Sequence, residues 1–149
     1  MSSNGKATLC HLGGFLGSFL PFVLGNIVVA FICWIVNRDD KFVDRHGKAA
    51  LNFQLSMTVY VLVLIFVAVF GFISMSFGAA GSGNIIFLLF GFFFLFGGLI
   101  ALAILAIAEM IWVVIASVRA SSGEEYEYPM TIRFIQNKKT TSEGGVKGK

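Results

Sequence analysis

The sequence predicts an all-α integral membrane protein with four helical segments: a short N-terminal helical hairpin followed by two long spanning helices. Of its 149 residues, 57% are hydrophobic and 13% are charged, whereas a soluble domain has about 25% charged residues. The stretch from Ala49 to Val118 carries a single charged side chain, Glu109. A water-facing surface cannot be assembled from this composition. In hydrocarbon, the apolar segments must be helical, because a helix satisfies its own backbone polar groups.

Turn-forming and polar residues divide the apolar sequence into four stretches, at 8–20, 22–36, 49–77 and 85–118. At 1.5 Å per residue, the third and fourth reach roughly 43 and 51 Å, more than the hydrocarbon core of about 30 Å. Both can therefore cross a bilayer, with tilt or projection beyond it. The first two reach only about 20 to 23 Å each, and Pro21, Gly25 and Asn26 separate them at a turn.

Two arrangements of the first two stretches remain open. They form either a hairpin that returns to the side it entered, or one kinked helix from Thr8 to Val36 that crosses the membrane. Lys and Arg near span ends are retained in the cytoplasm, and the hairpin places all 11 of them on one side. A kinked helix would leave Lys6 on the opposite side. The charges favour the hairpin, with both termini cytoplasmic.

The predicted organisation is an N-terminal cytoplasmic tail (1–6), a membrane domain (7–120) with a cytoplasmic connector (37–48), and a cytoplasmic tail (121–149). This last tail holds four of the eight acids and five of the eleven bases. After about residue 136 it is rich in Gly, Lys and Thr, and we expect it to be disordered. The net charge of +3 is small and its bases are dispersed, which excludes a nucleic-acid partner.

Glu109 is the first candidate for a functional residue, because a carboxyl group about 15 Å inside the membrane is costly. It is either a proton or cation site or a hydrogen-bonded packing residue, and we favour packing. The third stretch begins with a polar stripe at i+4 spacing, Lys48, Asn52, Ser56 and Tyr60. We expect this face to look inward and to supply a partner for Glu109 from Asn52, Ser56 or Tyr60. Gln54 is a further polar candidate, on another face.

The connector is the most distinctive polar segment. Asp44 and Lys48 have the spacing of a helical ion pair, and His46 can titrate near neutrality. Their role is either a satisfied structural turn or a ligand or proton site. We expect an interfacial helix to begin near Phe42 and to continue into the third stretch, since one glycine, Gly47, costs only about 1 kcal/mol.

The remaining motifs indicate packing rather than chemistry. Gly13 and Gly17 form a small-xxx-small pair, and Gly97-Gly98 is a second small site and a potential bend. We expect no cofactor and no metal, although Cys10, His11, Cys33 and His46 leave a membrane redox or haem carrier as a minor alternative. No nucleophile elbow, Walker loop or HExxH helix is present, so we expect the protein not to be an enzyme.

Three stretches resemble a bacterial membrane family without an assigned biochemical function: 9–16 (LCHLGGFL), 42–54 (FVDRHGKAALNFQ) and 128–135 (YPMTIRFI). That family is distantly similar to the small membrane subunit of the chloroplast Tic protein-import translocon. The resemblance covers about residues 7–135. It implies four helices in the cytoplasmic (inner) membrane of a bacterium, with cytoplasmic termini, and a role near a translocation or transport machinery. It supplies no catalytic residues.

The sequence thus favours a small polytopic membrane protein of unknown activity that is a structural or regulatory subunit of a larger complex. The alternative is a component of a transport or protein-translocation channel, which would require self-association because four helices are too few to enclose a pore. In both cases the expected partners are the lipid bilayer and other membrane proteins or further copies of this chain.

Overall fold

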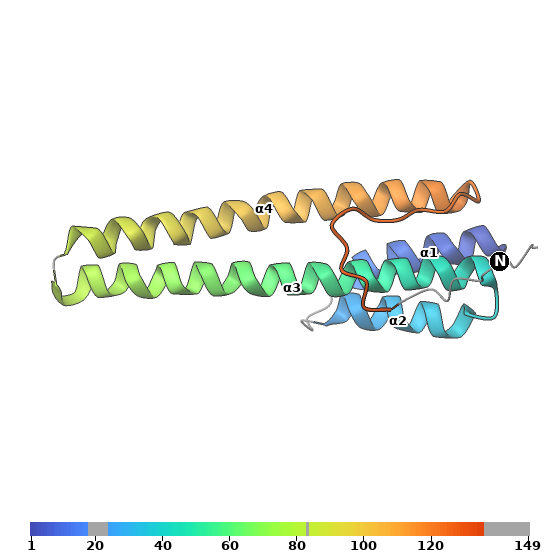
Figure 1. Ribbon diagram of the computed structural model, residues 1–149, viewed down its shortest axis with the longest axis horizontal. Helices are drawn as coiled ribbons and strands as arrows, with labels where there is room; N and C mark the ends of the chain where they lie inside the picture. Colours follow the sequence, from blue (N-terminus) through green and yellow to red (C-terminus); the bar gives the residue numbers. More distant parts are fainter. Residues whose placement is uncertain (18–23, 83, 136–149) are drawn as a thin grey trace, which may run out of the picture.

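The computed structural model describes residues 1–17, 24–82 and 84–135, and this part of the chain is helical without strands. Four α-helices follow one another as predicted (Figure 1): α1 (Ser3–Gly17), α2 (Gly25–Asn37), α3 (Lys41–Phe77) and α4 (Ile85–Ser121), with a π-helical turn, η1 (Gly78–Ser82), after α3. The expected break at Pro21 and the expected disorder after residue 136 lie outside the described residues.

α1 and α2 fold back on each other instead of forming one continuous helix. The start of α1, the α2–α3 connection and the end of α4 all lie at the same end of the molecule (Figure 1). α1 begins at Ser3, before the expected Ala7. The Ser3 hydroxyl donates to the Asp40 carboxylate, and this bond, together with the Phe42 N–H, lowers the pKa of Asp40. The helix arrangement is that of the predicted hairpin.

α3 is unbroken from Lys41 to Phe77, which confirms the continuous helix predicted through Gly47. The Asp40 carboxylate caps it by accepting from the Phe42 N–H at 2.9 Å. Most of the expected 37–48 connector is therefore helical, and the turn is confined to residues 38–40. A Cβ at Gly47 would lie 2.5 Å from Cδ1 of Trp34. Glycine is thus needed at this position because α2 approaches α3 closely.

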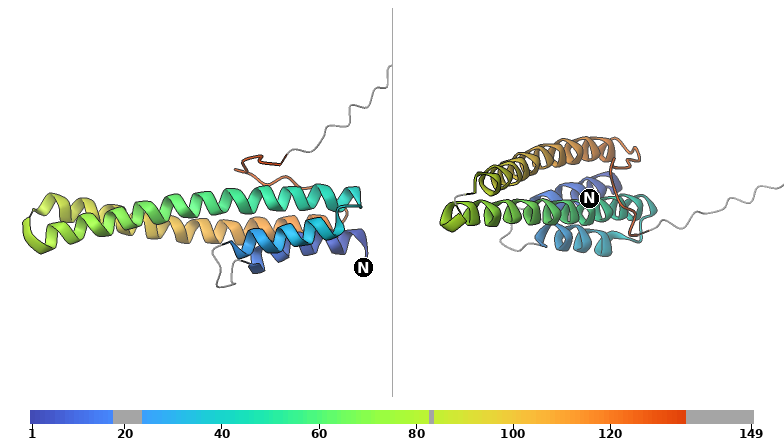
Figure 2. Two further views of the ribbon diagram at one scale, coloured as in Figure 1. Left: turned by 90° about the horizontal axis from the view of Figure 1, so that it is seen from below. Right: turned by 60° about the vertical axis from the view of Figure 1, so that its left-hand side comes forward.

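The molecule has two unlike halves (Figures 1 and 2). We call the first the bundle end: it comprises α1, α2, residues 41–60 of α3, residues 105–121 of α4, and the segment 122–135, which we call the strap. Its apolar core is formed by Phe53, Met57, Val113, Ala116 and Tyr128. We call the second half, residues 61–82 and 84–104, the distal hairpin, in which α3 and α4 run side by side with no further helix against them.

Glycines set the contact between helices in both halves. On α1, a Cβ at Gly17 would lie 2.4 Å from the Gly25 carbonyl oxygen of α2, and one at Gly13 would lie 3.2 Å from Val29 Cγ1. In the distal hairpin, a Cβ at Gly71 would lie 2.4 Å from the Leu95 nitrogen, and one at Gly91 would lie 2.4 Å from the Met75 nitrogen. At Gly17, Gly71 and Gly91 the facing backbone is too close for a larger residue, whereas at Gly13 the Val29 side chain would have to shift by a few tenths of an ångström.

The Gly97-Gly98 pair, expected to act as one packing site, is divided. A Cβ at Gly98 would lie 3.2 Å from Ala68 Cβ, so this glycine does face α3. A Cβ at Gly97 would meet nothing within 4 Å. Gly97 therefore has no packing contact within the described residues, because neighbouring residues of a helix are turned by about 100° from each other.

α3 with η1, over Lys41–Ala80, and α4 are both long and apolar enough to cross a membrane. Only 22% and 11% of their most apolar windows are buried within the protein. The core helix of a soluble protein would instead be mostly covered by other parts of the chain. Their exposed apolar side chains indicate association with a membrane.

Candidate functional site

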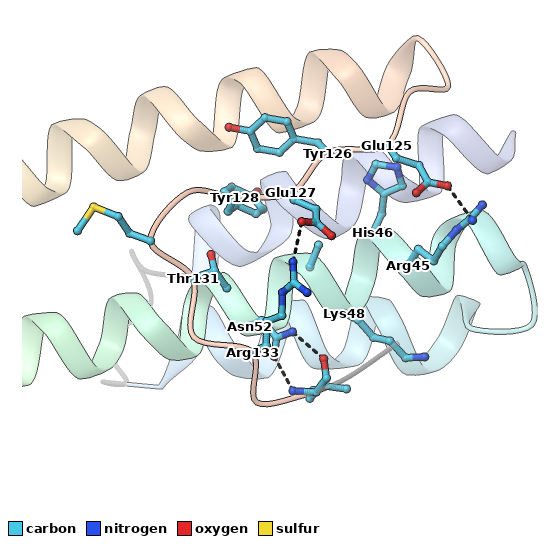
Figure 3. Close-up of a pocket in the computed structure, with 13 residues that line it drawn as sticks. Arg45, His46, Lys48, Asn52, Glu125, Tyr126, Glu127, Tyr128, Thr131 and Arg133 are labelled. Carbon is cyan, nitrogen blue, oxygen red and sulfur yellow. Dashed lines mark hydrogen bonds and ion pairs between the residues drawn. The ribbon is translucent and has the colours of Figure 1, made fainter. Parts of the chain in front are cut away.

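The strap is the feature that organises the polar side chains of the bundle end. After α4 the chain turns at Gly123, which has a φ of +79°, and crosses over α3 (Figures 1 and 3). The Asn52 side chain donates to the Ile135 carbonyl and accepts from the Ile135 N–H, both at 2.8 Å. The Ser56 hydroxyl accepts from the Ile132 N–H at 2.9 Å. These bonds hold the strap along the face of α3.

The polar stripe thus has a different partner from the expected one. Tyr60 continues the series, since its hydroxyl donates to the Met130 carbonyl at 2.8 Å. The prediction that Asn52, Ser56 or Tyr60 contacts Glu109 was therefore wrong, because these side chains satisfy the backbone of the strap. Residues 122–135 have no regular ladder of their own, and their buried N–H and C=O groups need such partners.

Glu109 instead lies near the side chain of Gln54. Gln54 is 1% exposed and also accepts from the Asn26 side chain of α2 at 2.9 Å. Asn26 reaches the Thr58 hydroxyl as well, at 3.2 Å. One carboxyl oxygen of Glu109, Oε1, is buried without a partner among the described residues. Gln54 therefore bonds α3 to α2, and it lies beside Glu109 of α4.

Three buried side chains from three segments form a hydrogen-bonded chain. The Tyr128 hydroxyl lies 2.9 Å from Nδ1 of His11, and Nε2 of His11 lies 2.8 Å from Nδ1 of His46. Burial raises the pKa of Tyr128 well above its usual value, so its hydroxyl stays protonated. With both imidazoles neutral, the protons can be arranged in either direction along the chain. The geometry is that of a short proton relay or of a fixed structural bridge.

This chain bears on the haem alternative. A metal ion between two imidazole nitrogens needs them about 4 Å apart, at about 2 Å from each, whereas His11 and His46 are in direct hydrogen-bond contact at 2.8 Å. The two residues therefore do not fit as ligands on opposite sides of an iron. Within the described parts of the chain, no group of three His, Cys, Asp or Glu residues is placed to hold a metal ion.

Asp44 and Lys48 pair as their spacing predicts, with Nζ 2.6 Å from Oδ2. The other carboxylate oxygen of Asp44 accepts from the Trp34 indole N–H at 2.8 Å. Because Trp34 is on α2, this bond ties α2 to the first turn of α3. Asp44 thus connects two helices at the bundle end and is not directed at a ligand.

A pocket of about 850 Å³ lies between the first turns of α3 and the strap (Figure 3). Two ion pairs border it, Arg45 with Glu125 at 2.7 Å and Arg133 with Glu127 at 2.8 Å. All four side chains are about half exposed or more, so each pair contributes little to stability. His46 forms part of the wall, and its Nε2 is buried without a hydrogen-bond partner among the described residues. The hydrogen-bonded chain of Tyr128, His11 and His46 therefore ends at the wall of the pocket.

Sequence reasoning missed the role of His11 and the strap. His11 was considered only as a haem ligand, although it lies in the middle of the buried chain with 1% of its surface exposed. Two signals were present: the polar stripe on an otherwise apolar helix, and the aromatic segment from Tyr126 to Phe134. Joining them requires knowing that the chain reverses at Gly123.

The comparisons with known proteins agree with a bacterial membrane family but give it a different character from the expected one. Residues 2–135 match the family MamF/MmsF, described as the magnetosome magnetite crystal formation protein family. Neither the curated proteins nor the solved structures contain a match. The expected relation to the Tic translocon is not among these findings. Because the match covers the four helices and the strap, the chain belongs to the MamF/MmsF family.

Proposed function

We propose that this protein is a membrane-embedded structural or regulatory subunit of the assembly that forms magnetite crystals in the magnetosome membrane. The observation that carries this proposal is the family match over residues 2–135, which includes every described helix. The arrangement of the two halves supports it, because one is suited to lipid and the other to contacts with further proteins. We propose further that the protein is not itself an enzyme.

The distal hairpin supports the membrane part of this proposal. Between residues 49 and 108 the chain contains no Asp, Glu, Lys or Arg. Its outward side chains are large and apolar, for example Phe66 at 74% and Phe93 at 72% exposed. In water such a surface would aggregate, whereas in a bilayer it is the favoured state. We therefore place α3 and α4 across the membrane.

The bundle end supports the subunit part. Several of its polar side chains bond to other parts of this chain, as Asn52 and Ser56 do with the strap. Its exposed charges have both signs and form the pocket rim, where about half or more of each side chain of Arg45, Glu125 and Arg133 is exposed to solvent. Such exposed ion pairs can exchange partners at small cost. This rim is the surface we expect an assembly partner to contact.

The same contacts argue against catalysis. Asn52, Ser56 and Tyr60 each bond to a backbone group of the strap, so these polar atoms are engaged in holding the fold. The relay of His11, His46 and Tyr128 has the composition of a proton pathway, but no nucleophile is bonded to it among the described residues. A fixed bridge between α1, α3 and the strap is the role that this geometry supports best.

Deletion of the gene in a bacterium that makes magnetite tests the proposal. We expect electron microscopy to show crystals of altered size or number, restored by the wild-type gene, while the iron content of the cells stays unchanged. Complementation with Gly97→Leu should restore the crystals and Gly71→Leu should not, with membrane levels followed by immunoblot. Normal crystals after deletion would contradict the proposal.

The transport alternative makes a different prediction in the same experiment. A channel or translocation component should change what crosses the membrane, so its loss should lower magnetosomal iron or remove particular proteins from the magnetosome membrane. Crystals that change only in size, within vesicles of unchanged protein composition and iron supply, would exclude that role. Mild-detergent purification of the tagged protein then identifies the partners of the subunit.

A further inference from the structure

The α1–α2 hairpin is much shorter than the helices it packs against. At 1.5 Å per residue, α1 reaches about 22 Å and α2 about 20 Å, while α3 and α4 reach about 55 Å each. The described inner end of the hairpin lies at the level of Thr58, which accepts from Asn26 at 3.2 Å. Past that level, α3 and α4 are the helices that continue (Figures 1 and 2).

The outward face of this short hairpin is apolar. It presents Leu9, Leu12, Leu16, Val28, Phe31, Ile32, Ile35 and Val36, each at least 37% exposed. No charged residue occurs between Ala7 and Asn37, so the face has no polar edge. Its side chains are of the same kind as the exposed apolar side chains of α3 and α4, for which lipid is the proposed surrounding. Acyl chains are therefore the occupant that its chemistry fits.

The length of the distal hairpin indicates which leaflet of the bilayer supplies the acyl chains around the α1–α2 hairpin. Residues 61–77 of α3 extend about 25 Å, which is more than the roughly 15 Å that one leaflet contributes to the hydrocarbon core but less than the whole core of about 30 Å. The leaflet around η1 is thus crossed by two helices. The α1–α2 hairpin, level with residues 41–60, stays in the opposite leaflet and its headgroup region, close to Lys6, Arg45 and Arg119.

We propose that the α1–α2 hairpin inserts as a wedge into one leaflet, so that the protein favours membranes curved with that leaflet on the convex side. Two helices of about 10 Å diameter add roughly 160 Å² of cross-section to that leaflet and none to the other. Shallow apolar helices bind in a curvature-dependent way for this reason. The inference rests on α3 and α4 crossing the bilayer, as proposed above, and not on a role in magnetite formation.

Membrane tubes pulled from giant vesicles test the wedge. The full chain is reconstituted in phosphatidylcholine with phosphatidylglycerol, and a C-terminal tag is labelled with an impermeant dye from outside, so that only molecules with the bundle end outward are seen. Because the outer leaflet of a tube is convex, these molecules should be enriched severalfold over the flat membrane. Molecules of the opposite orientation, labelled within and quenched outside, should be depleted. Equal densities for both orientations would overturn the proposal.

Variants on the outward face of α2 provide a second measurement. Val28→Lys with Ile32→Lys should draw this face towards water and abolish the enrichment, while Val28→Ala with Ile32→Ala keeps it apolar and should retain it. Single-molecule photobleaching counts the copies in each complex and shows whether a second copy covers the face instead of lipid. Dimers that are not enriched in the tubes would overturn the wedge. Release of the protein by alkaline carbonate would contradict the membrane placement itself, and is thereby distinguished from failure of the wedge alone.

Discussion

The bundle end and the distal hairpin are built on the same two long helices but are held together by different means. In the bundle end, side-chain hydrogen bonds join five segments, with Asn52 and His11 at their centre. In the distal hairpin, contact depends on Gly71 and Gly91, where the two backbones nearly touch. Lipid tails are as apolar as Leu, so hydrophobicity does not hold two helices together there, and close packing must do so. Small residues thus allow close helix contact in both halves, and in the distal hairpin they do so beyond the polar network of the bundle end.

The largest effect should come from Gly71→Leu. A Cβ at this position lies 2.4 Å from the Leu95 nitrogen of the facing helix, and a backbone atom cannot move aside as a side chain can. The helices must separate, and we expect the free energy of unfolding to fall by about 3 kcal/mol. Thermal unfolding in mild detergent, followed by circular dichroism, measures this loss.

Gly97→Leu is the matched control on the other helix. A Cβ there meets nothing within 4 Å, so the same change in size should alter the free energy of unfolding by no more than about 1 kcal/mol, in the stabilising direction expected from helix propensity. Equal losses for the two variants would show that the glycine contact does not hold the distal hairpin.

Asn52→Ala should have the next largest effect, in the bundle end. It removes two hydrogen bonds of 2.8 Å to the backbone of Ile135 and leaves those backbone groups unpaired. We expect a loss of about 2 kcal/mol and faster proteolysis within the strap, since its end is no longer held on α3. Ser76→Ala, which removes a bond within α3 to the Phe72 carbonyl, should leave the proteolysis rate unchanged.

Tyr128→Phe isolates the buried chain of side chains. The ring stacked on Phe53 at 3.9 Å is kept, but Nδ1 of His11 loses its partner. We expect a loss of about 1 kcal/mol, measured by thermal unfolding. Tyr126→Phe is the control, because its hydroxyl makes no hydrogen bond to the described residues, and it should behave as wild type. If Tyr128→Phe leaves the free energy of unfolding unchanged, the hydrogen-bonded chain of Tyr128, His11 and His46 does not contribute to the stability of the fold.

The smallest effect should come from Glu109→Gln, which keeps the size and hydrogen-bonding capacity and removes only the titration. If Glu109 is a packing residue beside Gln54, stability and magnetite formation should both stay near wild type, within about 0.5 kcal/mol. Glu109→Leu should cost about 1 kcal/mol through a lost interhelical bond. A Glu109→Gln variant that folds normally but does not support magnetite formation would favour a proton or cation site and overturn the packing interpretation.

The helices themselves were predictable because each is determined by residues that are neighbours in the sequence. The apolar runs at 49–77 and 85–118 place the end of α3 and both ends of α4 within a few residues of their observed bounds, and the interfacial helix expected from Phe42 gives the start of α3. The continuity of α3 through Gly47 followed from the small cost of one glycine. Gly13 and Gly17 were recognised by their spacing, since such spacing puts both on one helix face.

The candidate site was less predictable because it depends on contacts far apart in the chain. Asn52 and Ile135 are 83 residues apart, and Tyr128 and His11 are 117 apart. Helical spacing shows that Asn52, Ser56 and Tyr60 share a face, but it cannot show that a strap without regular structure covers it. The partner of Glu109 was missed for the same reason, since Gln54 is on a different face from the stripe.

Cysteine accessibility tests the central claim, that the bundle end lies at one membrane surface and only the distal hairpin reaches the other. In a chain with Cys10 and Cys33 replaced by alanine, single cysteines at Asp39, Leu24 and Ala80 are probed with an impermeant maleimide from each side of the membrane. We predict that Asp39→Cys reacts from the cytoplasmic side only, Ala80→Cys from the opposite side only, and Leu24→Cys not from the side of Ala80. Reaction of Leu24→Cys and Ala80→Cys from the same side would show that the first helices span the membrane and would contradict the account.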